Sequence, residues 1–208
     1  MRTLRVRGTG RIKQSPDLAV IKIRLNGNSK DYTVCSNILN NKIKELNKDI
    51  QKIGFDKKEL KAISLEINSR FETVEEVRVF KEFEAESRFI LKFDFISEKL
   101  TKVIETIANS KAEPEISIEF EIKDKEKFKN DLIEKAVLDS KLKAEKMSKA
   151  AGVKLGDIQS IDYSWSEIRM NSNFIMEESY CCSASSEFEL EPEEINASDD
   201  VTVVWEIK

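Results

Sequence analysis

The segment from Lys125 to Tyr163 restricts the possible folds more than any other part of the chain, because it pairs a long helix with a strand. Apolar or small side chains recur at helical spacing at Phe128, Leu132, Ala136, Val137, Ser140, Ala144, Met147 and Ala151. Gly152 is placed to cap this helix, and Gly156-Asp157 turns the chain into a strand over Ile158–Tyr163. The small side chains of the last turns allow a close approach, so we predict a helix packed on a sheet.

Alternating apolar and polar side chains predict strands elsewhere, over Arg2–Gly8, Leu18–Leu25, and residues 63–71, 83–95, 116–122 and 201–207. A polar turn near Thr73–Val77 is expected to join two of the long strands. Ser29 and Asp31 offer N-caps for a helix that Gly54 ends, and Ser97 is the expected cap of a helix reaching Asn109.

This order of elements predicts an α+β fold, with long antiparallel strands and helices packed on one face of the sheet. Two βαβ-like halves are expected to share one extended sheet. The chain has 208 residues, and no linker rich in Gly, Ser or Pro divides it before residue 165. We therefore predict a single domain over residues 1–208, with a long acidic irregular insertion at about 166–198.

The Gly8-Thr9-Gly10 pattern superficially resembles a phosphate-binding turn. It lacks a third glycine, and a strand rather than a helix is predicted to follow it. We therefore predict a turn or bulge between two strands at this position.

The chain has no histidine, which removes the commonest general base near neutral pH and the usual Ser-His and Cys-His nucleophile pairs. Cys35 is expected to be a reduced core or boundary residue. Cys181 and Cys182 are adjacent, and a redox or soft-metal site there would need further ligands that the neighbouring sequence does not offer. We predict no catalytic residues, no metal and no cofactor.

The charge and hydropathy limit the partners. A formal charge of −4, with lysines and acids alternating evenly from Lys111 to Lys149, gives no reason to expect nucleic-acid binding. No apolar run approaches the ~20 residues that span a bilayer. No secretory signal precedes the first predicted strand, so we expect a cytoplasmic protein, or a periplasmic one if a signal has been removed.

Four blocks of sequence carry a resemblance to a known family. They are RVRGTGRIKQSPDLAVIKIRL at the start, Ile53-Gly54 followed by the strand at Ile63–Ile67, LKAEKMSKAAGVKLGDIQSI at 142–161, and the strand ending Val-Thr-Val-Val-Trp-Glu-Ile. In this order they are similar to the SIMPL domain family, also called domain of unknown function 541. The resemblance implies an α+β fold and a tendency to self-associate, in bacterial proteins that include periplasmic, stress-linked and signalling members. It supplies no catalytic residues.

The segment from Ser166 to Asp200, here the acidic segment, carries ten Asp or Glu residues against one Arg and no Lys. It is either a disordered excursion or an arm that docks on a neighbouring subunit, with salt-dependent association. The residues expected to make such contacts are Ile168, Met170, Phe174, Ile175, Met176, Tyr180 and Phe188.

Two classes of function follow from these patterns. The first is a non-enzymatic, self-associating structural or protein-interaction protein, related to stress, that forms homo-oligomers. The alternative is a small-ligand binding protein or weak enzyme, with a pocket between helices and sheet that uses carboxylates or the two adjacent cysteines.

Overall fold

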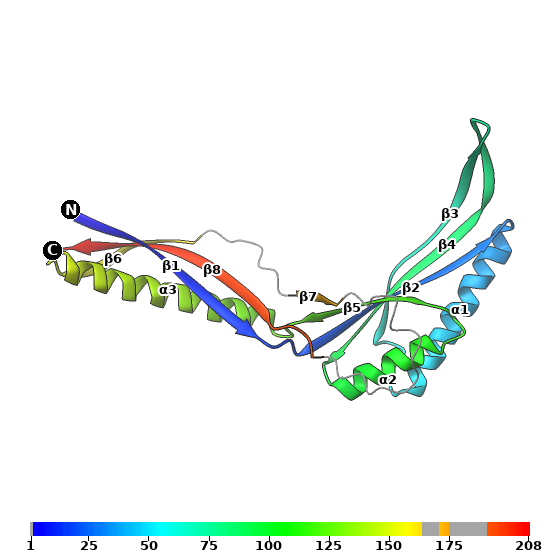
Figure 1. Ribbon diagram of the computed structural model, residues 1–208, viewed down its shortest axis with the longest axis horizontal. Coiled ribbons are helices and arrows are strands. Elements are labelled where there is room, and N and C mark those ends of the chain that lie inside the picture. The colour runs from blue at the N-terminus through cyan, green and yellow to red at the C-terminus, as the bar shows by residue number, and fades with distance from the viewer. Residues whose placement is uncertain (1, 164–170, 175–190) are drawn as a thin grey trace. The chain divides into compact units, whose positions relative to one another are not determined.

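A computed structural model describes residues 2–163, 171–174 and 191–208 of the chain. The chain divides into two compact units (Figure 1). The helices and strands confirm the predicted α+β class. The strands form two sheets, however, so the prediction of one shared extended sheet is wrong. Pro16 lies between the first two strands, where its missing N–H favours an interruption of strand pairing.

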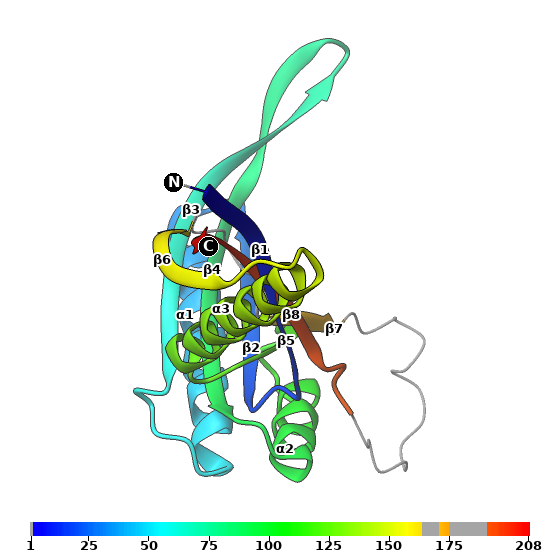
Figure 2. The same ribbon diagram turned by 90° about the vertical axis from the view of Figure 1, so that its left-hand side faces the viewer.

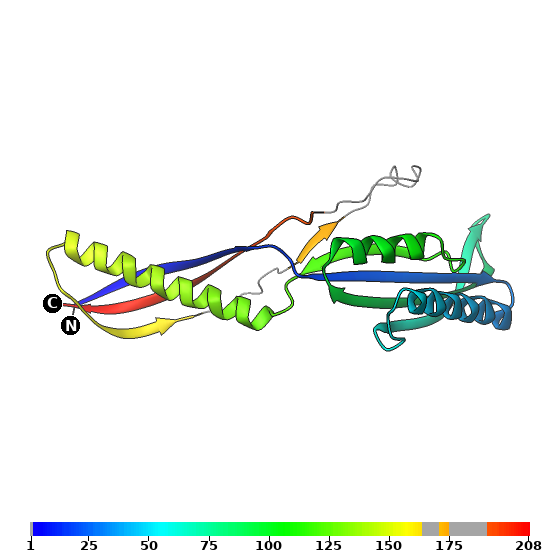
Figure 3. The same ribbon diagram turned by 90° about the horizontal axis from the view of Figure 1, so that it is seen from below.

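The two-helix unit comprises residues 17–120 and 173–192. Its sheet has the order β3-β4-β2-β5-β7. Helices α1 and α2 lie on the same face of this sheet (Figures 1 and 3). The elements are β2 Leu18–Ser29, α1 Tyr32–Lys52, β3 Leu60–Val74, β4 Val77–Asp94, α2 Ser97–Ala108, β5 Glu115–Glu121 and β7 Asn171–Phe174.

Strand alternation builds the core of the two-helix unit. Ile21, Ile23 and Leu25 on β2 are buried, whereas Lys22 and Arg24 between them are exposed. The buried set packs against apolar residues of both helices, including Leu39, Leu46, Ile50, Leu100 and Val103.

The predicted ends of the helices are correct in three of four cases. Gly152 follows α3 with a φ of +71°. The Asp31 carboxylate accepts a hydrogen bond from the Val34 N–H at 2.9 Å, as an N-cap does. Gly54 follows α1 with a φ of +95°, a conformation that favours glycine. Ser97 is the first residue of α2 rather than its cap, because Ile96 holds the extended cap position and contributes no side-chain hydrogen bond.

The single-helix unit comprises residues 1–16, 121–172 and 193–208. Its sheet has the order β1-β8-β6, and α3 lies along one face of it (Figures 1 and 3). Antiparallel pairing joins β8 to both neighbours. The elements are β1 Arg2–Gln14, α3 Lys125–Ala150, β6 Leu155–Asp162 and β8 Ile195–Ile207.

The buried stripe of α3 differs from the predicted one in its last turns. It repeats at every fourth residue, at Phe128, Leu132, Ala136, Ser140, Ala144 and Ser148. A step of four residues exceeds one helical turn by about 40°, so the stripe winds around the helix. Met147 and Ala151, which the prediction placed on the buried face, are exposed.

Gly8 and Gly10 lie inside β1, which pairs with β8 without a register shift. The prediction of a turn or bulge is therefore wrong. A Cβ atom on Gly8 would lie 2.0 Å from the Ala136 carbonyl oxygen, and one on Gly10 would lie 2.0 Å from the Leu132 carbonyl oxygen. The two glycines are the points where the helix backbone meets the strand.

The last strand begins at Ile195, six residues before the predicted start at Val201. Asp199 and Asp200 belong to this strand because they pair with Gly10 and Thr9 of β1. The Asp200 carboxylate accepts from the Arg7 guanidinium at 2.7 Å and from the Thr9 hydroxyl at 2.6 Å. The description as a single domain with an insertion stays a prediction.

Candidate functional site

Most of the predicted contact residues of the acidic segment fall outside the described residues. These are Ile168, Met170, Ile175, Met176, Tyr180 and Phe188. Cys181 and Cys182, considered for a redox or soft-metal site, also lie outside the described residues. Phe174 is the last residue of β7, which lies next to β5. Docking by the acidic segment therefore stays a prediction. Cys35 is buried as predicted, and its thiol donates to the Gly27 carbonyl oxygen at 3.1 Å.

The helix-free face of the two-helix unit carries charged side chains. Lys22 contacts Glu119 at 2.5 Å, and the Arg88 guanidinium contacts Glu86 at the same distance. Arg24 lies between Glu86, at 3.8 Å, and Glu115. Lys22, Arg24 and Arg88 therefore each already have a carboxylate beside them, which disfavours binding of phosphates or other anions by these three cations.

An open depression of about 280 Å³ lies on the same charged face. Lys22, Arg24, Ile63, Arg88 and Glu115 are among its lining residues. The alternative function predicted a pocket between helices and sheet, and this depression lies on the opposite face. Its openness and its paired charges offer little to hold a small ligand.

The polar side chains of the single-helix unit tie its elements together. The Asp139 carboxylate accepts from the Lys143 ammonium at 2.6 Å and from the Thr9 backbone N–H at 2.8 Å, and these bonds lower its pKa. Hydrogen bonds from Arg7 and Thr9 likewise lower the pKa of Asp200. Both groups are held ionised at neutral pH, so neither is suited to general acid–base catalysis.

Tyr163 is a further group of this unit whose pKa is shifted. Burial, together with its hydrogen bond to the Asp199 carboxylate at 2.7 Å, raises its pKa to about 12. The phenol therefore stays neutral and acts as a donor that joins the end of β6 to β8. Within the described ranges, no group of three or more His, Cys, Asp or Glu side chains is arranged to hold a metal ion.

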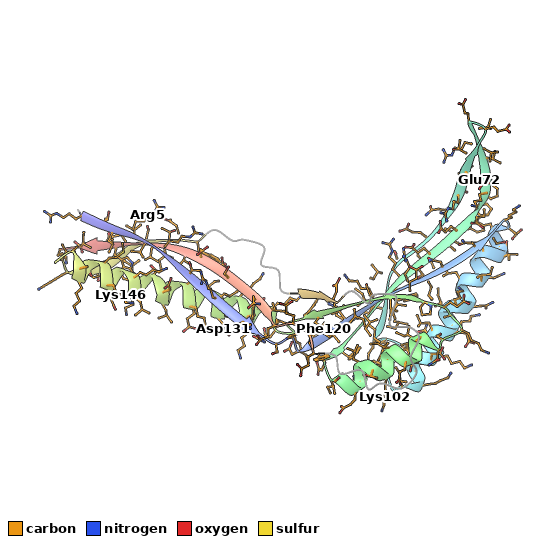
Figure 4. All side chains as sticks on the ribbon, viewed as in Figure 1. Arg5, Glu72, Lys102, Phe120, Asp131 and Lys146 are labelled. Carbon is orange, nitrogen blue, oxygen red and sulfur yellow. The ribbon has the colours of Figure 1, made fainter. Side chains whose placement is uncertain are left out.

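Among the described residues, the end of the β3–β4 hairpin is the surface that stands out. Pairing of β2 with β4 ends at Ser29 and Phe83, whereas β3 and β4 continue to Val74 and Val77. Figures 1 and 2 show these two strands running beyond α1 as a ribbon, and Glu72 lies towards its end in Figure 4. We call residues 69–82 the hairpin extension.

A row of aromatic side chains follows one face of this ribbon. Tyr32 and Phe83 have ring centroids 5.5 Å apart, Phe83 and Phe80 5.0 Å, and Phe80 and Phe71 6.0 Å. The Arg78 guanidinium lies over the Phe71 ring at 4.3 Å. Phe71 and Phe80 remain 43% and 40% exposed. The aromatic row thus extends beyond the core to a surface that leaves large apolar groups in water.

Further apolar side chains are exposed on β3 and near the turn. They are Ile63, Leu65, Val74, Val77 and Val79. Strand β3 is also an edge of its sheet, so one side of its backbone has no strand partner among the described residues. Exposed apolar groups on a long open edge are typical of a surface that pairs with another chain.

The hairpin turn is strained in its backbone. Glu75 and Glu76 have φ values of 48° and 66°, which residues other than Gly, Asn and Asp rarely adopt. The predicted polar turn between Thr73 and Val77 is confirmed, since Val74 pairs with Val77.

Replacing the turn by Asn-Gly, in the variant E75N/E76G, is expected to stabilise the protein by about 1–2 kcal/mol, because these residues suit a turn with two positive φ values. Urea unfolding would measure the change. The variant E75Q/E76Q removes the same charges without relieving the backbone. Equal stability of these two variants would contradict a backbone origin.

Comparison with protein families identifies the chain. The model of the SIMPL family, described as a protein of unknown function (DUF541), matches residues 4–205. The chain belongs to the SIMPL family. The match covers both compact units, so the resemblance found in the sequence is confirmed. A search of curated proteins finds no match.

The hairpin extension of this SIMPL chain is the feature that the sequence analysis missed. Alternation predicted strands over residues 63–71 and 83–95, whereas β3 runs to Val74 and β4 begins at Val77, so most of the extension lay outside the predicted strands. Its exposure depends on where β2 ends and α1 begins, which alternation does not report. The one local signal is the set of valines close to the turn, where a solvated hairpin would carry polar side chains.

None of the helices that the structure describes is long and apolar enough to cross a bilayer.

Proposed function

We propose that this SIMPL protein is a non-enzymatic, self-associating structural or interaction protein. The hairpin extension carries the proposal, because it exposes Phe71 and Phe80 beside an open strand edge. Covering apolar surface contributes roughly 25 cal/mol per Å², and pairing the edge satisfies its backbone groups. Both gains need a second protein surface.

Sedimentation velocity over a range of concentrations tests self-association. The wild-type protein is expected to sediment as a species larger than its 23.9 kDa chain, in equilibrium with smaller ones. The variant F71S/F80S is expected to shift this equilibrium towards the single chain. L138S/L142S is a matched control, since it removes two exposed leucines of α3 instead.

A strict single chain at every concentration would overturn the proposal. An equal effect of the two double variants would remove the role of the hairpin extension. Small-ligand binding has weaker support, because the depression on the charged face is open and its cations are paired. A cytoplasmic location and a relation to stress stay predictions.

A further inference from the structure

The edge strand β3 offers a regular stretch of backbone for pairing. The pairing of β3 with β4 has two register shifts. At the first, Ile63 is an extra residue in β3, and at the second, Lys81 is an extra residue in β4. Residues 64–74 of β3 therefore run without an extra residue of their own. Their outward N–H and C=O groups can accept a complementary strand along this whole length.

The side chains of this stretch are complementary to themselves. Glu66 and Arg70 lie two residues on either side of Asn68, and Leu65 and Phe71 lie three residues on either side. In an antiparallel pair related by a two-fold axis, residues equally distant from the axis oppose one another. An axis at Asn68 would therefore place opposite charges together and apolar groups together.

We infer that a second copy of this chain pairs with β3 in antiparallel orientation, with Asn68 opposite Asn68 of the second copy. This inference rests on the proposed self-association and names its surface. Glu66 faces Arg70 of the second copy, and the same contact forms again across the axis. Leu65 and Phe71, which are 60% and 43% exposed, then cover one another.

The charges of the isolated chain favour this contact. Within its own sheet, Glu66 lies opposite Glu86 of β4, and like charges in such a pair repel. In the part of the chain that the structure describes, the Glu66 carboxylate has no hydrogen bond or ion pair. Arg70 contacts Glu84 at 3.6 Å, with both side chains exposed, so it can reach a second carboxylate. The second copy supplies the cation that Glu66 lacks.

Neighbouring registers lose this complementarity. An axis at Ile67 would set Glu66 opposite Asn68 and Arg70 opposite Ser64. An axis at Ser69 would set Glu66 opposite Glu72, two acids. Registers shifted by one residue would place the helix-covered face of one copy beside the charged face of the other. Only the axis at Asn68 pairs both charges while it keeps the two apolar faces on the same side.

Single cysteines report the register directly. In a C181S/C182S background, which leaves the buried Cys35, N68C is expected to form a cross-linked dimer under mild oxidation. Opposed residues of an antiparallel pair have Cα atoms about 4.5–5.5 Å apart, within disulfide reach. E66C and R70C alone are expected to stay uncross-linked, since each is about 14 Å from its own copy. An equimolar mixture of the two is expected to cross-link.

Charge exchange measures the same contacts in solution. E66R and R70E are each expected to weaken dimerisation about tenfold, because each turns two attractive pairs into two repulsive ones. The double variant E66R/R70E is expected to return to within about threefold of wild type. A mixture of the two single variants restores both attractive pairs and is expected to associate better than either alone.

Sedimentation of the wild type in the same experiment separates the possible failures. If the protein self-associates but N68C does not cross-link, or the double variant is as weak as the single ones, this register is overturned and self-association stands. If the wild type is a single chain throughout, both are overturned.

Discussion

Replacing Gly8 by alanine is expected to destabilise the single-helix unit by about 3 kcal/mol or more. The added Cβ atom would lie 2.0 Å from the Ala136 carbonyl oxygen and 2.6 Å from the Ser140 backbone nitrogen. Neither atom belongs to a side chain that can rotate away, so α3 must move off β1. That movement opens the apolar core beneath the helix, which contains Val6 and Trp205.

Trp205 provides the measurement. The chain has two tryptophans, so a W165F background leaves Trp205, which is buried in this core, as the single fluorescent reporter. Its emission should shift to the red at a lower urea concentration in G8A. Arg11→Ala, an exposed change on the same strand, is the control and should alter stability by less than about 0.5 kcal/mol. A G8A variant as stable as the wild type would refute the close approach of helix and strand.

Replacing Phe120 by alanine is expected to cost about 3–5 kcal/mol in the two-helix unit. Phe120 is 1% exposed and meets Phe95 edge to face, with ring centroids 5.1 Å apart. The truncation leaves a cavity between β5 and the helix-covered core. Surrounding side chains can fill this cavity only in part, because they extend from a sheet and helices that are already packed.

Amide hydrogen exchange measures this loss, since β2 and β4 belong to the same core and their amides should exchange faster. Lys102→Ala on α2 is the control, because Lys102 is exposed; Figure 4 labels both residues. Unchanged exchange in F120A would show that Phe120 does not support this core.

Local patterns in the sequence predicted the elements well, because the physics behind them is local. Alternation marks strands with one wet face, and Asp31 and Gly54 mark the two ends of α1. The burial of Cys35 was also predicted correctly. Four blocks in the right order sufficed for the family, which the match over residues 4–205 confirms.

The arrangement of the strands depended on contacts distant in sequence. Gly8 and Gly10 were expected to turn the chain, yet they serve a helix more than 120 residues away. The hairpin extension was missed for the same reason. Its exposure depends on contacts distant in sequence, since it follows from β2 ending at Ser29 and α1 beginning at Tyr32.

The sequence by itself determined the positions of the longer helices and strands, the buried faces of the core strands, most of the helix ends and the family. Each of these depends on residues within a few positions of one another. Only the tertiary structure decided that the strands form two sheets, that Gly8 and Gly10 are contact points, and that β3 is an open edge. These features depend on which surfaces meet, and a strand carries the same alternation whether its edge is paired or free.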